Sequence, residues 1–401
     1  MYGARGPVDC SVNGQGHGAW SSWVERALCA LDEASLKRKR MPIEAIDSLR
    51  VRFEGVPLTL FSANDYLGLS CHPEVRAAAA ESASAFGMGP RGSALICGYT
   101  DQHEALEQEL ARLKGTEAAL LTPSGFSANM ALFSAFGGAD VAIFSDSLNH
   151  ASIVDACRLA ARSGAEVSVY PHADVSALDA LLERCDRPRR LIVSDGLFSM
   201  DGDAAPLEAL VELKKRHGAL LCVDDAHGTL VFGASGGGVA EAQGVSADVD
   251  LHVGTLSKAF GALGGFVAAS KVWCEWLLNK GRAQIYSTSL PLPLVAAARA
   301  ALSVAQREPA HRERLWAHIE RVAEALHMPA RGPVFSRILG DPERALEASR
   351  HLLAAGIHVT AIRPPTVPTG TSRLRVTLSA AHRSEDIDAL LDAMKELEEP
   401  G

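Results

Sequence analysis

The sequence predicts an α/β protein whose larger part is built around a mostly parallel β-sheet, with a smaller α+β domain at the C-terminal end. Short apolar strands alternate with helical stretches from about residue 100 to residue 290. This alternation is typical of βα units, and near-continuously apolar strands are typical of a sheet that is covered on both faces. After about Pro291 the alternation gives way to two long helical stretches and a shorter α+β segment.

Three parts are predicted along the chain. They are an N-terminal arm with a helix (1–58), a large α/β domain (59–292) and a small α+β domain (293–401). The predicted strands of the large domain are 118–121, 141–144, 167–170, 191–193, 219–223, 251–253 and 266–269, with helices after Ser124 and at 151–161, 175–182 and 207–215. The small domain is predicted to contain helices at about 293–306, 310–326, 342–354 and 384–398, and strands at 334–338, 357–362 and 374–378.

The N-terminal arm contains an amphipathic pattern from about Trp23 to Arg40. Ser22 with Glu25 fits a capping box, in which each side chain bonds a free amide at the helix start. A basic run ends the pattern, and cations suit the negative end of a helix dipole. The sequence therefore predicts one helix over this whole stretch.

The composition is that of an ordinary globular protein. The chain has 401 residues, of which 47% are hydrophobic and 22% charged, and such a chain can bury a sizeable core. The formal net charge of −9 argues against a nucleic acid or an anionic membrane surface as a partner. Apolar runs stay shorter than the roughly 18 residues that a membrane-spanning helix needs, so no membrane partner is expected.

The cysteines and histidines show no disulfide or metal pattern. Eight cysteines are scattered along the chain without a CxxC pair, which is typical of reduced cysteines in a cytosolic protein. The histidines lack the HExxH spacing and other metal-ligand spacings. The segment from Met1 to Gly18 is rich in glycine and lacks the apolar stretch of a secretory signal. We therefore predict a cytoplasmic protein without a metal site.

A lysine follows the predicted strand 251–253. The segment from Gly254 to Gly265 places Lys258 among Thr, Ser and Gly residues. The carboxyl end of a strand in a parallel sheet is where α/β proteins bind ligands. A desolvated lysine amine has a lowered pKa and can form a Schiff base with a carbonyl compound. The motif alone fits an ordinary surface lysine as well.

Two carboxylates and a histidine follow the neighbouring predicted strand, 219–223. The sequence continues Asp224-Asp-Ala-His227. Since a buried carboxylate is costly without a cation, Asp224 is expected to meet a positive charge. The protonated pyridine nitrogen of pyridoxal 5′-phosphate (PLP) is such a cation, and an Asp partner keeps it charged so that the ring acts as an electron sink. The structural alternative for Asp224 is the cap of the next turn.

Two further turns fit such a site. The segment Thr122-Pro-Ser-Gly-Phe-Ser-Ala-Asn129 begins a helix. Free amides at a helix start can bind a phosphate, and Gly125, which lacks a Cβ, lets the phosphate approach the backbone closely. His150 begins the helix after strand 141–144, where it can stack on a cofactor ring or serve as a structural histidine. The spacings GxGxxG and GxxxxGK[ST] are absent, which disfavours a nucleotide-binding module.

Taken together, these motifs resemble those of the α-oxoamine synthases, which are PLP enzymes of the aspartate-aminotransferase-type fold, fold type I. The resemblance runs from about Leu28 to Met394. The motifs that carry it, in the family's order, are Ser62-Ala-Asn-Asp-Tyr-Leu-Gly-Leu69, Ser124-Gly-Phe126, Asn149-His-Ala-Ser152, Leu197-Phe-Ser-Met-Asp-Gly-Asp203, Val223-Asp-Asp-Ala-His-Gly228, Thr255-Leu-Ser-Lys258, Ile285-Tyr-Ser-Thr288, Ala361-Ile-Arg-Pro-Pro-Thr-Val-Pro368 and Arg373-Leu-Arg-Val-Thr377.

The resemblance implies roles for individual residues toward PLP. Lys258 would bind the cofactor covalently, and Asp224 would pair with its pyridine nitrogen. His150 would stack on the ring, and His227 and Ser199 would hydrogen-bond its phenolic oxygen. The phosphate would be held by Gly125 and Phe126 through their backbone amides, by Thr255 and Ser257, and by Ser287 and Thr288 from a second subunit.

The resemblance also implies a substrate side. Arg375 would clamp the carboxylate of an amino acid through a bidentate pair, which a lysine cannot reproduce. The remaining implied substrate contacts are Arg363 and Thr366 on the acyl side, Asn64 and Tyr66 at a dimer interface, and Arg38 as a looser match in a basic run.

The implied reaction is a decarboxylative condensation of an amino acid with an acyl thioester, catalysed by a homodimer whose active sites lie at the interface. The segments 361–368 and 198–206 look most like the branch that joins L-alanine to a pimeloyl thioester in biotin biosynthesis. Two departures from the family are Arg91, where many bacterial members have glycine, and Asp195, where others often carry glutamate; neither is expected to touch the PLP chemistry. The alternatives are a relative that uses glycine or serine with another acyl-CoA, and a non-catalytic scaffold subunit.

Overall fold

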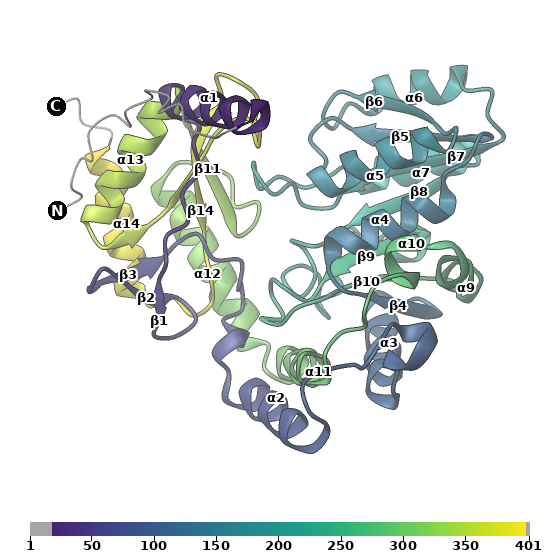
Figure 1. The fold of residues 1–401 in the computed structure, drawn as a ribbon, viewed down its shortest axis with the longest axis horizontal. Coiled ribbons are helices and arrows are strands. Elements are labelled where there is room, and N and C mark those ends of the chain that lie inside the picture. Colours follow the sequence, from purple (N-terminus) through teal and green to yellow (C-terminus); the bar gives the residue numbers. More distant parts are fainter. Residues whose placement is uncertain (1–17, 398–401) are drawn as a thin grey trace.

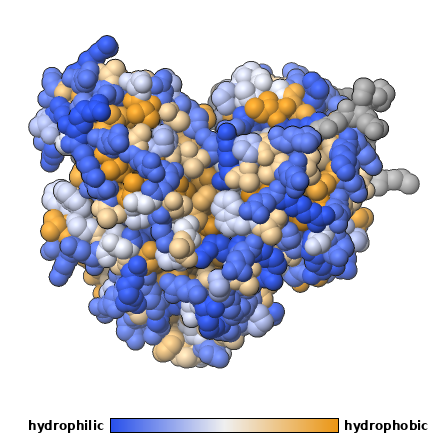
Figure 2. All heavy atoms as spheres, turned by 180° about the vertical axis from the view of Figure 1, so that it is seen from behind, coloured by the Kyte–Doolittle hydropathy of each residue, from blue (hydrophilic) through white to orange (hydrophobic). Residues whose placement is uncertain are grey.

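The structure is a computed structural model that describes residues 18–397. It has two lobes, which lie side by side and are joined at one end by α2 (Pro73–Phe86) and α11 (Leu292–Arg307) (Figure 1). The space-filling view from behind shows that the surface is notched between the two lobes (Figure 2). The glycine-rich segment from Met1 to Gly18 lies outside the described residues except for Gly18. Residue 398, the predicted end of the last helix, also lies outside them.

One lobe is built on a seven-stranded sheet with the order β4-β10-β9-β8-β7-β5-β6. The pairs β9–β8, β8–β7, β7–β5 and β5–β6 are parallel, whereas β10 is antiparallel to both β4 and β9. The predicted α/β class with a mostly parallel sheet is therefore confirmed. The strands are β4 (Ala118–Thr122), β5 (Val141–Asp146), β6 (Glu166–Tyr170), β7 (Arg189–Asp195), β8 (Leu220–Asp224), β9 (Leu251–Thr255) and β10 (Gly265–Ala269).

Helices cover both faces of this sheet, which explains why its central strands are apolar along most of their length. Ile143 of β5 belongs to a core shared with α4, α5 and α9, whereas its neighbour Phe144 belongs to a core shared with α6 and α7. The helices of this lobe are α3 (Asp101–Lys114), α4 (Gly125–Phe136), α5 (Ala151–Arg162), α6 (Val175–Arg184), α7 (Leu207–His217), α8 (Val239–Ala242), α9 (Lys271–Lys280) and α10 (Arg282–Ile285).

The other lobe combines the two ends of the chain. In one sheet, of order β1-β2-β3-β12, the N-terminal strand β3 pairs in parallel with β12 from the C-terminal part, and a second sheet has the order β11-β14-β13. The elements are α1 (Ala19–Glu33), β1 (Glu44–Ala45), β2 (Arg50–Phe53), β3 (Val56–Leu60), α12 (Ala310–Ala325), β11 (Val334–Gly340), α13 (Pro342–Ala354), β12 (Ile357–His358), β13 (Thr360–Ile362), β14 (Ser372–Thr377) and α14 (Ser384–Glu396), with short turns of helix elsewhere at Leu69–Cys71, Ala94–Gly98 and Ser246–Asp248.

The first helix differs from the prediction. It begins at Ala19 rather than Trp23, has no side-chain cap from Ser22, and ends at Glu33. Ser35 adopts φ 55°, in the left-handed region, and the N–H of Lys37 turns back to the carbonyl of Leu31. The left-handed residue stops the helix, so the basic run that was predicted to end it lies in the following loop.

Two other expectations are corrected or extended. Cys29 is disulfide-bonded, so the prediction of reduced cysteines is wrong for this residue, whereas Cys222 is a buried free thiol. Within residues 18–397, no helix combines the length and the apolar character that crossing a bilayer requires.

Candidate active site

The candidate site forms where the parallel strands end. β5 ends at Asp146, β7 at Asp195 and β8 at Asp224, and the last two aspartates are direct register partners. The neighbouring strand β9 leads into the loop that carries Lys258. Because the carboxyl ends of adjacent parallel strands share one edge of the sheet, the loops that follow them face a common space.

Asp224 is the buried carboxylate that the sequence predicted at this edge. Asp224 is only 6% exposed. Its Oδ2 accepts a hydrogen bond of 2.7 Å from Asn129 Nδ2, and its Oδ1 accepts one from the N–H of Ala226. Neither donor carries a charge, so the carboxylate keeps its capacity to stabilise a cation such as a protonated pyridine nitrogen.

Lys258 is half-buried in the loop after β9 and lies within electrostatic reach of both aspartates. Burial lowers the pKa of Lys258 to about 8; the charges of Asp224 and Asp195 oppose this change, and Arg375 adds to it. An amine with such a pKa is neutral in about a tenth of molecules at pH 7, far more than an ordinary lysine with a pKa of about 10.4. It can therefore act as a nucleophile toward a carbonyl group or accept a proton.

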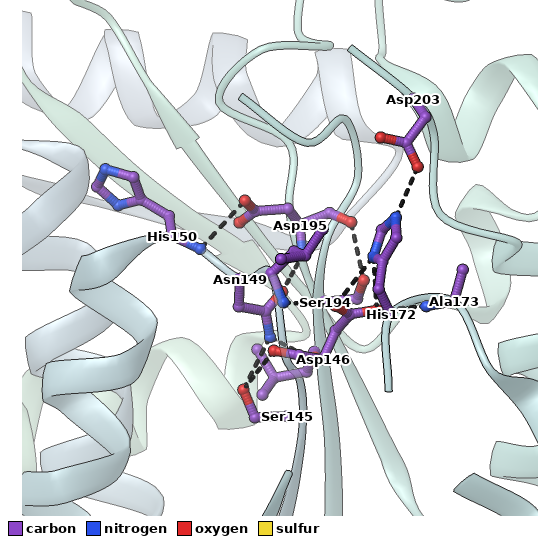
Figure 3. A network of polar contacts seen from close by, with 11 residues as sticks. Ser145, Asp146, Asn149, His150, His172, Ala173, Ser194, Asp195 and Asp203 are labelled. Atoms are coloured by element: carbon purple, nitrogen blue, oxygen red, sulfur yellow. Dashed lines mark hydrogen bonds and ion pairs between the residues drawn. The ribbon is translucent and has the colours of Figure 1, made fainter. Parts of the chain in front are cut away.

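His150 caps the start of α5, where the N–H of Ser152 donates to its Nδ1. The N–H of His150 donates to Asp195 Oδ2, and the ring points away from this contact (Figure 3). The pKa of His150 is lowered, first because the surrounding protein shields the ring from bulk water and then by the charge of Lys258, against the pull of Asp224. The imidazole is therefore held at Nδ1 by the start of α5.

Asp195 lies at the site as well, a position that the sequence did not indicate. It is 4% exposed beside Asp224 and accepts a hydrogen bond from the backbone N–H of His150. Burial raises its pKa, the negative charge of Asp224 raises it further, and Lys258 opposes the change. The sequence could not reveal this position because it depends on the register between β7 and β8.

A chain of polar contacts links the two lobes across the site. Nδ1 of the buried His227 lies 2.6 Å from the hydroxyl of Tyr66, which donates to Asn64 Oδ1. Both Nη atoms of Arg375 donate to the same oxygen at 3.4 Å, and its Nε donates to the carbonyl of Ser199 at 2.6 Å. Burial and the charge of Lys258 lower the pKa of His227 well below its usual range, so this imidazole is neutral.

The predicted phosphate site is a compact turn. Ser124 caps α4 by accepting from the N–H of Ser127, and a Cβ on Gly125 would lie 3.3 Å from Cβ of Thr255. The hydroxyl of Ser257 lies 2.8 Å from that of Thr255. Hydroxyls and free amides at a helix start are the kinds of group that can bind a phosphate. Phe126 is 45% exposed beside them.

Ser287 and Thr288 lie apart from Lys258, in a cavity of about 210 Å³. Thr288 forms an isolated bridge with Ser93. The cavity also contains Tyr99 and Glu107, whose carboxylate accepts from the tyrosine hydroxyl at 2.7 Å. Within one chain, Ser287 and Thr288 therefore line this cavity rather than the site around Lys258.

Arg38, Arg363 and Thr366 form another separate group. Arg38 Nη2 donates to the hydroxyl of Thr366 at 3.3 Å, and Arg363 Nη1 donates to the carbonyl of Ser35. Burial lowers the pKa of Arg363, and so does the positive charge of Arg38. The Nε of Arg363 is buried without a hydrogen-bond partner among the described residues. Two close cations with a free donor favour an anionic ligand.

Comparisons with known proteins place this geometry in a family. A family profile described as "Aminotransferase class I and II" matches residues 56–394. The chain belongs to the aminotransferase class I and II family. The family and its relatives are PLP-dependent, and the Lys258–Asp224 arrangement, with a phosphate turn beside it, fits that cofactor. The family resemblance and the fold type predicted from the motifs are confirmed.

Relatives in this family share most of the chain. A protein of Arabidopsis thaliana named 8-amino-7-oxononanoate synthase is 52% identical, and the match covers 84% of this chain and 74% of that protein. The protein of that name from Anaeromyxobacter dehalogenans is 48% identical, with 93% of this chain and 94% of that protein covered. The protein of Geobacter sulfurreducens with the same name is 46% identical, with coverages of 91% and 95%.

Solved structures of two named activities share the fold. The serine palmitoyltransferase of Sphingomonas wittichii has a TM-score of 0.88 and 32% identity, with 94% of this chain and 96% of that chain covered. The 8-amino-7-oxononanoate synthase of Francisella tularensis has a TM-score of 0.71 and 27% identity, with coverages of 85% and 98%.

Proposed function

We propose that this protein is an 8-amino-7-oxononanoate synthase. It condenses L-alanine with a pimeloyl thioester and releases CO2 and the free thiol carrier, as one step of biotin biosynthesis. The observation that carries the proposal is the 52% identity to the Arabidopsis protein of that name over 84% of this chain. The arrangement of Lys258, Asp224 and Arg375 supplies the chemistry.

PLP, when bound, withdraws electrons from the α-carbon of an amino acid. Asp224 is proposed to hold the proton on the ring nitrogen, and His150 to pack on the ring face. His227 and Ser199 are proposed to bind the phenolic oxygen. The proposed phosphate ligands are the amides of Gly125 and Phe126 and the hydroxyls of Thr255 and Ser257.

Lys258 is proposed both to bind the cofactor and to move a proton at the substrate α-carbon. Its pKa of about 8 suits both tasks, since a general base works best when its pKa is close to the working pH. Arg375 is proposed to bind the carboxylate of alanine. Its guanidinium is held by Ser199 and Asn64, so its orientation is set before the amino acid arrives.

The acyl side is proposed to lie at Arg38, Arg363 and Thr366. A pimeloyl thioester carries a carboxylate at the end of its chain, and the repulsion between the two arginines falls when such an anion binds. A dicarboxylic acyl group would therefore bind better here than a plain fatty acyl group.

We propose that the protein is a cytoplasmic homodimer. Leu95, Ile96 and Tyr286 are exposed apolar residues of the segments around the Ser287–Thr288 cavity, with exposed fractions of 52%, 81% and 73%. Covering such residues with a second copy stabilises the assembly. The arrangement would also bring Ser287 and Thr288 to the partner's cofactor.

One assay tests the proposed reaction. Purified protein is supplied with PLP, and thiol release and product mass are measured with alanine, glycine or serine against pimeloyl-CoA and palmitoyl-CoA. We expect turnover with alanine and pimeloyl-CoA and none in the Lys258→Ala variant. Because structures titled serine palmitoyltransferase reach a TM-score of 0.88, a preference for serine with palmitoyl-CoA would replace the proposal by that activity.

A further inference from the structure

A histidine beyond the proposed cofactor contacts lies between two carboxylates. His172 follows β6, and its Nδ1 lies 3.1 Å from Asp146 Oδ1 while its Nε2 lies 2.8 Å from Asp203 Oδ2 (Figure 3). An ionised carboxylate only accepts hydrogen bonds, so both ring nitrogens must carry a proton. The geometry is therefore that of an imidazolium between two anions.

The surroundings favour the charged ring. Asp146 is 2% exposed, and Oδ1 of Asp203 is buried without a partner among the described residues. Burial tends to lower the pKa of His172, but the hydrogen bonds and charges of the two aspartates outweigh it and raise this pKa. Nearby on β6 and β7, Tyr170 and Asp195 are titratable groups on which the charge of Asp146 also acts. Phe198 places its ring edge-on to the imidazole, at 4.4 Å between centroids.

The two aspartates lie at two loops that form different walls of the site. One wall is the loop after β5, which carries His150, and the other is the loop after β7, which carries Ser199. Asp146 accepts from the N–H groups of Leu148 and Ala173 and so shapes the turn that leads to His150. Ala173 adopts φ 53° in this arrangement, in the left-handed region.

The carbonyl of Asp203 accepts from the N–H of Phe198, the residue before Ser199. The carbonyl of Ser199 in turn accepts from Arg375. One imidazolium thus connects the wall that carries His150 with the wall that carries Ser199.

We propose that His172 is a positioning residue whose imidazolium ties these two loops together and so sets the spacing across the cofactor site. The proposal rests on the proposed function, since it concerns the walls of the same site. It assigns no contact between His172 and a cofactor or substrate. Its effect passes through Asp146 to His150 and through Asp203 to Ser199.

The charge state of His172 is tested on the full-length protein without PLP. Histidines labelled with 13C are titrated by NMR, and His172 is assigned from the missing signal in the His172→Gln variant. We expect it to titrate above the ordinary histidine value of about 6.5, because both carboxylates stabilise the charged ring. In the Asp203→Asn variant, which keeps an acceptor but removes a charge, the titration should shift to lower pH. An ordinary titration in the wild type would overturn the proposal.

The positioning role is tested by PLP binding. In His172→Gln, one amide replaces two charged donors, and we expect the Kd for PLP to rise by about tenfold because both walls lose their spacing. The matched control is His351→Gln, which removes a histidine that contacts Glu396 on the surface and should leave the Kd unchanged. Circular dichroism checks that each variant is folded.

The pH dependence separates positioning from simple structural damage. As pH rises through the pKa of His172, the wild type should lose PLP affinity, Asp203→Asn should lose it at lower pH, and His172→Gln should lack this step. If all three proteins lose PLP affinity at the same pH, the loss is caused by titration of groups other than His172, and the positioning role is refuted. If His172→Gln binds PLP with the wild-type Kd, the positioning role is refuted. If His172→Gln does not fold, Asp203→Asn decides instead: a pH dependence of its PLP affinity that matches the wild type also refutes the role. A wild type that binds no PLP refutes the proposed function instead, while the NMR titration still decides the charge on His172.

Discussion

At the scale of single residues, Lys258 gives the most direct test of the site. Burial outweighs two carboxylates and places the pKa of Lys258 at about 8, compared with about 10.4 for a free lysine. Only the neutral amine attacks the aldehyde of PLP. We therefore expect the rate of covalent attachment to rise as pH increases and to level off above about pH 8. The measurement is the growth of visible absorbance after apoprotein and PLP are mixed.

The Lys258→Ala variant is the control for this experiment, because it removes the amine and should show no such absorbance. A rate that keeps rising to about pH 10, as for an ordinary lysine, would show that the loop does not desolvate Lys258.

Arg363 tests the acyl side. Arg363→Met keeps much of the side-chain volume but removes the charge next to Arg38. A charge-assisted hydrogen bond contributes about 1.5–3 kcal/mol, so we expect KM for pimeloyl-CoA to rise by about tenfold or more with a smaller change in kcat. The KM for alanine should stay the same. The surface variant Arg158→Met, which removes an exposed ion pair with Asp155, is the matched control, and equal KM values in both variants would contradict the assignment.

The placement of the candidate site residues at strand ends was predictable, whereas the residues that surround them were not. Lys258 and Asp224 stand out because polar groups directly follow apolar strands. Asn129, whose amide holds Asp224, lies on α4, far from Asp224 in sequence. No local signal marks such a long-range hydrogen bond. The position of Asp195 beside Asp224 was unpredictable for a related reason, since it depends on the register of two strands.

At the scale of elements, the turn after Asp224 is held by a buried ion pair. Lys114, the last residue of α3, donates to Asp225 Oδ2 at 2.9 Å, to Thr229 and to the carbonyl of Gly237. The side chains of the pair are 0% and 1% exposed. This network fixes the segment between Asp224 and the next helix, so it serves the site without touching it.

Removing Lys114 leaves the Asp225 carboxylate buried without its cation. We expect Lys114→Met to lower the free energy of unfolding by about 3–5 kcal/mol, measured by urea denaturation. Lys395→Met is the matched control, because the pair of Lys395 with Asp392 is 70% and 75% exposed and such pairs contribute about 0–1 kcal/mol. Similar losses in the two variants would argue against a structural role for the buried pair.

Strands buried on both faces were predicted almost to their ends, because apolar runs between turns leave few alternatives. The hairpin of β2 and β3 was missed, although its two-residue turn carries a signal. Glu54 and Gly55 have φ values of 49° and 81°, and hairpin turns with two positive φ values favour Gly at the second position. The end of α1 was misplaced because a left-handed serine carries no sequence signal. Ser35 is an ordinary residue for a helix until the structure shows its φ.

At the scale of the whole molecule, the site is shared between lobes that come from different parts of the chain. Tyr66 and Arg375 belong to segments around the smaller sheets, and His227 and Lys258 follow strands of the large sheet. The alternation of strands and helices predicted the large sheet. It could not predict that β3 and β12 pair, since parallel pairing over such a separation leaves no periodic trace.

The proposed homodimer makes a prediction that joins assembly to cofactor binding. Ile96 is 81% exposed in the segment beside the Ser287–Thr288 cavity, so an Ile96→Asp substitution would bury a charge in the proposed interface. We expect the wild type to sediment as two chains and the variant as one. Loss of the partner's hydroxyls from the phosphate should weaken PLP binding by about tenfold or more, because hydrogen bonds to a charged group contribute about 1.5–3 kcal/mol each. Val169→Asp is the matched control, since Val169 is 62% exposed on β6 at the other edge of the large sheet and should leave both properties unchanged. A wild-type monomer with full PLP affinity would show that each chain completes its own site.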